Sequence, residues 1–225
     1  MKKIIYTALF GNYDNWHEPD FVNTDWKYIL FTDQDITSKV YQVIKIKGDV
    51  LKAREIKLLP HRFLPDYDIC FWHDASIIQR SNINEIIKKE RVWDMIIMEH
   101  GQRSCLYAEA EECIKRGKGN KTKIMNQINR YRQEKIPENT GLVASGLMIR
   151  KNNYRVRLFC EKWWNELKNE SIRDQISFSY TLYNHNKIKD KAILIKKMPY
   201  TIRKTLFQHR LHRNERTELI RNILS

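Results

Sequence analysis

The 225-residue sequence lacks several patterns that would place it in a common class at once. Its four cysteines are scattered and form no CxxC pair, so a cysteine-based metal site is not expected and a reduced, cytosolic protein is the default. No apolar run approaches the roughly 20 residues that span a bilayer. The short apolar run after Met1 is broken by Gly11 and Asp14 without a small-residue cleavage site, and we interpret it as a first strand rather than a signal peptide.

Neither GxSxG nor HExxH occurs, and no recognised nucleic-acid-binding motif is present. Acidic residues are outnumbered, with 27 Asp and Glu against 41 Lys and Arg, which gives a formal charge of +14. The basic residues gather in two places, in the run "KRGKGNKTK" (115–123) and from residue 187 to the end of the chain. Such charge suits nucleic acid, anionic lipid or phosphorylated ligands alike, so charge alone does not choose a function.

Strand and helix patterns alternate along the chain, without an internal repeat or a low-complexity linker. This alternation predicts an α/β fold whose central sheet is mostly parallel and is flanked by helices. We expect one domain over residues 1–200. A basic, partly amphipathic helical extension over 201–225 would pack on the domain or lie on an anionic membrane surface. The predicted strands are 2–10, 26–33, 41–47, 67–78, 93–100, 141–152 and 191–199. The predicted helices are 51–64 (bent or ended by Pro60), 82–92 (capped by Ser81 or Asn82), 105–135 (broken at "GKGN"), 154–169 and 171–186 (capped by Ser171).

Polar residues follow four of the predicted strands. In a parallel sheet, ligands bind at the carboxyl ends of the strands, so these residues predict a cleft at one edge. They are residues 11–14 ("GNYD"), Thr32 and Asp33, residues 73–76 ("HDAS"), and Glu99 with His100.

Three segments resemble, in order, motifs of the GT-A glycosyltransferases, which have a Rossmann-like fold. The segment "AREIKLLPHRFLPDYDICFWHDASI" is similar to the run that leads into the metal-binding DxD. "GLVASGLMIRKN" resembles the strand beside the sugar pocket, and "IRDQISFSYTL" resembles the helix that carries a "DQ" pair.

The pattern is closest to a glycosyltransferase-like family, formerly a domain of unknown function, shared by bacterial proteins and plant proteins linked to cell-wall polysaccharides. The resemblance covers residues 4–185, and the basic tail lies outside it. The matching motifs are Tyr6-Thr7-Ala8 through Asp14, Phe31-Thr32-Asp33, Arg54 through Asp74, His100 through Ala110, Gly141-Leu142 and Ser171 through Phe178.

This resemblance implies a hexosyl- or pentosyltransferase that uses a nucleotide-sugar donor, with a UDP-sugar as the first expectation. The acceptor would be a saccharide or a lipid-linked saccharide, in the synthesis of surface polysaccharide or glycoconjugate. The resemblance also implies assistance by Mn²⁺ or Mg²⁺ and a cytoplasmic location, free or peripheral on the inner face of the membrane. No nucleic acid is expected as a partner, and the oligomeric state stays open.

Two alternatives remain at this stage. A basic nucleic-acid-binding protein is favoured only by the charge, and it leaves the acids at the strand ends unexplained, because carboxylates repel phosphates. A hydrolase could use the same metal site, with water in place of the acceptor.

The resemblance also implies roles for individual residues. The metal would be held by Asp74, by Ser76 where a second Asp is common, and by a histidine, for which we choose His209 over His100 or His212. Asp74 could otherwise be a simple strand-end cap. The donor would be bound by Thr7, Ala8, Phe10, Gly11, Tyr13, Asp33, Arg54, Lys57, His73, Asp74, Ala75, Ser145 and Gly146.

Within this set, Arg54 and Lys57 lie one helical turn apart and hence on one face. His73 is adjacent to Asp74 on a strand, where neighbours point to opposite faces, which favours a structural role for it.

Acceptor or sugar recognition would fall to His100, Arg103, Tyr107 and Glu109, and catalysis to Asp174 with Arg173 and Gln175. Asp174 would deprotonate the acceptor hydroxyl in an inverting enzyme or orient the donor sugar in a retaining one. The alternative is a capping role, with Asp174 at the third helical position after Ser171.

Overall fold

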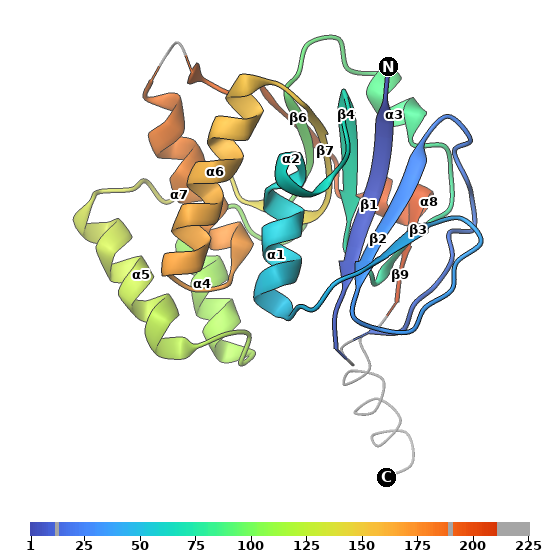
Figure 1. Cartoon of the computed structure of the whole chain (residues 1–225). Coiled ribbons are helices and arrows are strands. Elements are labelled where there is room, and N and C mark those ends of the chain that lie inside the picture. The colour runs from blue at the N-terminus through green and yellow to red at the C-terminus, as the bar shows by residue number, and fades with distance from the viewer. Residues whose placement is uncertain (12–13, 189–190, 211–225) are drawn as a thin grey trace.

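The computed structural model describes residues 1–11, 14–188 and 191–210 (Figure 1). Its centre is a seven-stranded sheet in the order β3-β2-β1-β4-β7-β6-β8. Four of the six strand pairings are parallel, and β7 runs antiparallel to both of its neighbours. The strands are β1 (Lys3–Leu9), β2 (Lys27–Thr32), β3 (Gln42–Lys45), β4 (Ile69–His73), β6 (Met95–Glu99), β7 (Val143–Lys151) and β8 (Ile195–Met198). The predicted α/β fold with a mostly parallel sheet is confirmed.

The helices cover the sheet unequally. In Figure 1, α1, α6 and α7 lie over one face, with α4 and α5 outside α7, whereas among the helices of the described residues the short α3 and α8 lie on the other side. The helices are α1 (Val50–Leu58), α2 (Pro60–Phe63), α3 (Asn84–Lys88), α4 (Leu106–Lys115), α5 (Lys121–Gln133), α6 (Tyr154–Asn169), α7 (Asp174–Asn186) and α8 (Ile202–Leu206). As predicted, Pro60 separates α1 from α2 and the "GKGN" segment separates α4 from α5.

Alternation along the strands divides the core into two layers. Residues such as Tyr6 and Trp72 point toward α1 and α6, where they pack with Phe159 and Trp163. Their neighbours on the strands, such as Phe71, point to the opposite face. A third apolar cluster joins α4 and α5 to α7. Successive side chains of a strand therefore face different layers, as the pleat requires.

The strand predicted over 67–78 is two strands. β4 ends at His73, a turn follows in which the amide of Ile77 donates to the carbonyl oxygen of Asp74 (2.8 Å), and β5 (Ile77–Gln79) begins a separate two-stranded sheet. Its partner is β9 (Phe207–His209), with Ile77 opposite His209. The break takes the chain out of the central sheet directly at Asp74.

Two predicted helix caps are wrong. α3 begins after Ile83, without a side-chain cap, although the amide of Asn84 donates to the side chain of Asn82 (3.0 Å). α7 begins after Arg173, again without a side-chain cap, and the Ser171 hydroxyl donates to Gln127 instead (2.5 Å). Asp174 is consequently the first residue of α7 rather than the third.

Part of the basic extension belongs to the packed structure. α8 follows β8, and Phe207 of β9 is buried against Phe71 on the face opposite α1. Residues 211–225, which hold the rest of the predicted extension, lie outside the described residues. No helix in the described ranges is long and apolar enough to cross a membrane.

Arg130 on α5 ties three helices together. Its guanidinium pairs with Glu166 on α6, with Glu170 at the end of α6 (3.0 Å) and with Glu134 (2.9 Å). It also donates to the hydroxyl of Tyr180 on α7 (3.0 Å) and lies over that ring. Burial raises the pKa of Glu166, and the nearby guanidinium offsets part of that cost. Arg130 therefore helps to hold α7, the helix that begins with Asp174.

We expect Arg130→Met to lower the free energy of unfolding by about 2 kcal/mol, below the cost of breaking a fully buried ion pair because Arg130 is partly exposed. Lys123→Met, an exposed change of the same kind on the same helix, is the control and should cost under about 0.5 kcal/mol. Urea unfolding of both variants measures the difference. Equal losses would show that Arg130 does not join the helices.

Candidate active site

A cavity of about 490 Å³ opens at the edge of the sheet where β1 and β4 end. Its walls come from segments far apart in the sequence, which the parallel strands bring to one edge as the strand-end pattern predicts. The lining residues are Ala8, Leu9, Phe10, Asp14, Asp49, Val50, Ala53, Arg54, Lys57, Trp72, Asp74, Ala75, Ser76, Gly117, Lys118, Gly119, Ser145, Gly146, Ile172, Arg173, Asp174 and Gln175.

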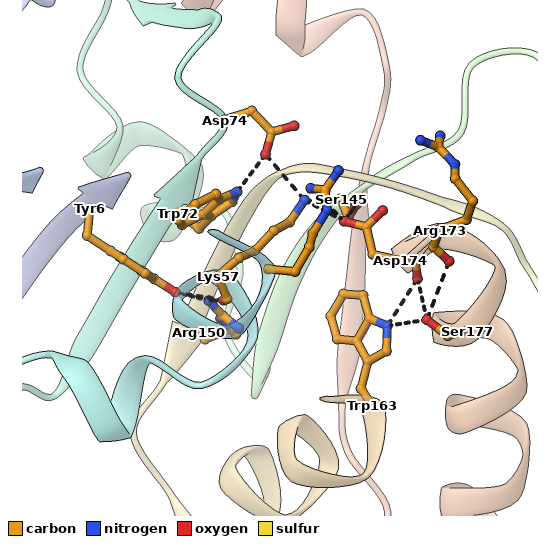
Figure 2. A network of polar contacts seen from close by, with 11 residues as sticks. Tyr6, Lys57, Trp72, Asp74, Ser145, Arg150, Trp163, Arg173, Asp174 and Ser177 are labelled. Carbon is orange, nitrogen blue, oxygen red and sulfur yellow. Dashed lines mark hydrogen bonds and ion pairs between the residues drawn. The ribbon is translucent and has the colours of Figure 1, made fainter. Parts of the chain in front are cut away.

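Lys57 lies at the base of this cavity and is 1% exposed. Its ammonium contacts Asp174 Oδ2 (2.6 Å), Asp74 Oδ1 (3.2 Å) and Ser145 Oγ (3.2 Å), so its three protons have three acceptors (Figure 2). The side chain reaches this point because α1 is fixed at its start by Asp49, which accepts from the amide of Lys52 (2.8 Å). Lys57 joins the end of β4, the start of α7 and the first part of β7.

Asp74 occupies the first position beyond β4. Its amide donates to the carbonyl oxygen of Gly146 (2.9 Å), and its Oδ1 accepts from Lys57 and from Trp72 Nε1 (2.8 Å). Oδ2 faces Gly146, where a Cβ atom would lie only 3.1 Å from it. The absent side chain at residue 146 therefore leaves room for the carboxylate. Lys57 and Arg54 lower the pKa of Asp74 against the opposing effect of burial, so it is ionised.

The β6–β7 pairing is irregular beside the cavity. Its register shifts between Ile97 and Met98, so that Met98 lies opposite Ala144 while Ile97 lies opposite Met148. The skipped residues include Ser145, whose hydroxyl donates to Asp174 Oδ2 (2.9 Å). Irregular pairing of this kind re-aims side chains next to functional sites, and here it directs Ser145 into the cluster.

Asp174 is held on both its backbone and its carboxylate. Trp163 Nε1 donates to its carbonyl oxygen (3.0 Å), and Oδ2 accepts from Lys57 and lies 3.3 Å from Arg54 Nη1. Burial alone would raise the pKa of Asp174, but Arg54, Lys57 and Arg173 together hold that pKa well below the usual range. Asp174 Oδ2 is already engaged with Lys57, Arg54 and Ser145, and this arrangement favours a positioning role over proton abstraction.

Most predicted donor and catalytic residues line the cavity. The structure brings together Ala8, Phe10, Arg54, Lys57, Asp74, Ala75, Ser76, Ser145, Gly146, Arg173, Asp174 and Gln175. Thr7 is buried and is not part of the lining, and neither are Gly11 and Asp33, which contact each other through the Gly11 amide and the Asp33 carboxylate (3.0 Å). Tyr13 lies outside the described residues.

His73 points away from the cavity. Its Nδ1 donates to the carbonyl oxygen of Asp74 (3.2 Å), and its Nε2 accepts from the hydroxyl of Tyr41 (2.8 Å). Burial lowers the pKa of His73 to about 4, so the ring is neutral. This is the satisfied structural environment that strand alternation indicates for the residue.

The residues predicted for acceptor recognition form a separate network that does not line the cavity. Glu109 is buried and accepts from Arg103 Nε (2.6 Å). His100 Nδ1 accepts from the amide of Arg103 (3.0 Å), which leaves Nε2 as the donor toward Glu109 (3.5 Å). The Tyr107 hydroxyl donates to the carbonyl oxygen of Ile136 (2.8 Å). These contacts fix the segment between β6 and α4.

Few protein atoms are placed to act as ligands of a divalent cation. Asp74 Oδ2 has no hydrogen-bond partner in the described part of the chain, and the Ser76 hydroxyl lies 3.5 Å from His209 Nε2 across the β5–β9 pair. No cluster of three His, Cys, Asp or Glu side chains suited to a metal occurs in residues 1–11, 14–188 and 191–210. Mg²⁺ and Mn²⁺ commonly keep water and substrate oxygens as most of their ligands, so the carboxylate of Asp74 with the Ser76 hydroxyl in the same lining fits such an ion, whereas His209 is not among the lining residues.

Sequence reasoning missed part of the far wall of the cavity, formed by Gly117, Lys118 and Gly119 between α4 and α5. The "GKGN" segment predicted a break between helices, but its lysine was not assigned to the cleft. Two glycines around a lysine in a basic run were the available signal.

The chain belongs to a glycosyltransferase-like family. The model of the TOD1/MUCI70 glycosyltransferase-like domain matches residues 36–212. A probable hexosyltransferase, MUCI70 of Arabidopsis thaliana, is 28% identical over 134 residues, which are 55% of this chain and 23% of that protein. The chain thus matches less than a quarter of this relative's length. Among solved structures, apo mouse xyloside xylosyltransferase 1 aligns with a TM-score of 0.47 and 10% identity, over 88% of this chain and 84% of that one.

The ionised state of Asp174 predicts a pH-dependent stability. Because the folded pKa lies below the unfolded value of about 3.9, the folded chain binds fewer protons, and stability is gained as pH rises. We expect wild type to exceed Asp174→Asn by about 2–4 kcal/mol in the free energy of unfolding at pH 7. The difference should persist to about pH 5 and shrink toward pH 3.

Urea unfolding between pH 7 and pH 3 tests this expectation. Glu111→Gln, at an exposed position on α4, is the control and should give a small difference that varies little with pH. A wild-type advantage over Asp174→Asn that stays constant down to pH 3 would contradict the ion-paired state.

Proposed function

We propose that this protein transfers a hexosyl or pentosyl group from a nucleoside-diphosphate sugar, most simply a UDP-sugar, to a saccharide or lipid-linked acceptor. The observation that carries the proposal is the Lys57 cluster, which places Asp74 and Asp174 together on the wall of the cavity. Membership of the glycosyltransferase-like family supports the same chemistry.

The order of the strands suggests how the donor would lie. β1, β4 and β7 are consecutive in the sheet, so the walls they supply follow one another across the cavity. The nucleoside would lie beside Ala8 and Phe10 at the end of β1, and the diphosphate beside Asp74 at the end of β4. The sugar would then lie beside Gly146 on β7 and Gln175 on α7.

Charge development on the diphosphate is the main electrostatic problem of this reaction. Arg54 lies in the same wall as Lys57 and is 22% exposed, so its guanidinium can contact a phosphate while Lys57 stays engaged with the two carboxylates. A divalent cation, when bound, would supply a Lewis acid for the leaving phosphate. Asp74 Oδ2 would be its protein ligand, with Ser76 and His209 as further donors.

Asp174 would act as a positioning residue for the donor. Its carboxylate fixes Arg54 and Lys57, and its place at the start of α7 sets the position of the adjacent Gln175. The positive end of the α7 dipole adds to its stabilisation as an anion. The proton of the acceptor hydroxyl would then pass to an oxygen of the departing diphosphate, which gains negative charge as its bond to the sugar breaks.

Thermal denaturation with a panel of UDP-, GDP- and CDP-sugars tests the proposal. At a ligand concentration about 100 times Kd, one donor should stabilise the wild type by about 2.7 kcal/mol, or roughly 5–10 °C in Tm. We expect this shift to require Mn²⁺ or Mg²⁺ and to disappear in Asp74→Ala.

Asp66→Ala removes an exposed carboxylate near the opposite end of β4 and should keep the shift. A wild type that no nucleotide sugar stabilises, but that single- or double-stranded nucleic acid does, would refute the transferase. A donor shift that is the same with EDTA as with Mn²⁺ would refute the metal.

A further inference from the structure

We propose that Lys118, together with Arg173, binds an anionic group on the acceptor, so that the acceptor carries a carboxylate or a phosphate near the hydroxyl that receives the sugar. The proposal rests on the function proposed above and concerns the wall of the cavity that faces away from β1. Its first support is the conformation of the segment that presents Lys118.

The segment between α4 and α5 has a defined shape. Gly117 has φ +63° and donates to the carbonyl oxygen of Ile114 (3.1 Å), and the amide of Lys118 donates to that of Cys113 (2.8 Å). These two bonds form a Schellman motif, which ends α4. Gly119 has φ +99°, and Asn120 then caps α5. Both neighbours of Lys118 have positive φ, which glycine adopts without strain. The two glycines therefore let the backbone hold Lys118 in a defined position at the wall of the cavity.

The charge around this segment is unbalanced. No Asp or Glu occurs from residue 113 to residue 133. Arg116 pairs with Glu112 one turn earlier on α4, and Arg130 pairs with Glu166 on α6. Lys118 is exposed at the cavity, and no carboxylate lies within ion-pair distance of it in the described part of the chain. It is therefore a cation available to a ligand.

Arg173 extends the same cationic wall. In Figure 2 its guanidinium extends away from the contacts that hold Asp174. A Cβ atom at Gly119 would lie 3.6 Å from Arg173 Cδ, so the arginine packs directly against the loop. Its Nε is buried without a hydrogen-bond partner. Lys118 and Arg173 thus come from different segments and meet at one end of the cavity.

The position of this wall selects the acceptor over the donor. Along the sheet, β1 and β4 precede β7, and the α4–α5 segment belongs to the part of the fold that packs against α7, beyond β7. A donor laid from β1 toward β7 has its diphosphate beside Asp74 and its sugar beside Gly146. The group that meets Lys118 then lies beyond the transferred sugar, where the acceptor must approach.

NMR titration of the ¹⁵N-labelled full chain, saturated with UDP and Mg²⁺, tests this inference. The probes are methyl glucoside, methyl glucuronoside and methyl glucoside 6-phosphate, and the signals followed are the amides of Gly117 and Gly119. We expect the anionic glycosides to shift both signals and the neutral one to leave them in place. The two anionic probes distinguish a carboxylate from a phosphate.

Lys118→Ala should weaken anionic-probe binding about fivefold, as for an exposed charge pair, and higher salt should weaken it further. Lys121→Ala removes an equal charge from an exposed position outside the cavity lining and should change it less than twofold. Absence of an anion-selective shift, or equal effects of the two variants, overturns this inference. Failure of the wild type to bind any nucleotide overturns the proposed function instead, so the two failures are distinguishable.

Discussion

The site depends on one ion pair network, in which the buried ammonium of Lys57 lies between the buried carboxylate of Asp174 and the partly exposed carboxylate of Asp74. Two carboxylates brought this close would repel each other, and removing Asp174 from water is costly, so the pair requires a cation between its members. Lys57 supplies that cation, and its third N–H group donates a hydrogen bond to the hydroxyl oxygen of Ser145. The network therefore fixes the relative positions of β4, β7 and α7.

The backbone at Lys57 is fixed by two buried side chains of the central sheet. The Tyr6 hydroxyl donates to the carbonyl oxygen of Lys57 (2.9 Å), and the guanidinium of Arg150 on β7 contacts the same oxygen (2.6 Å). Both side chains are fully buried. Strand β7 contacts both the side chain of Lys57, through Ser145, and its main chain, through Arg150, so rotation or translation of α1 would break both sets of contacts. A rigid supporting shell of this kind lets a site keep its geometry before a ligand arrives.

The sequence predicted the alternating α/β architecture well, because β-branched and aromatic runs and helical periodicity are local signals. The ends of β1 and β4 were predicted to share an edge, and they do. Contacts between distant segments carry no local signal: Lys57 and Asp174 are 117 residues apart. For the same reason the network of His100, Arg103 and Glu109 looked like a binding surface, although its polar atoms satisfy one another. The wrong cap at Ser171 has a similar origin, since Gln127 on another helix competes for its hydroxyl.

Acidic and basic side chains occupy different ends of the cavity. Among the described lining residues, Asp14 and Asp49 lie toward β1 and the start of α1, whereas Lys118 and Arg173 lie toward α7. Lys57 and Arg54 offset the charges of Asp74 and Asp174, and Arg173 also contributes at Asp174. The described lining as a whole is therefore balanced, with four basic and four acidic side chains. A nucleoside-diphosphate sugar would add negative charge to this balance beside Asp74. That consideration supports the proposed divalent cation there, because Lys118 and Arg173 lie at the other end, where we place the acceptor.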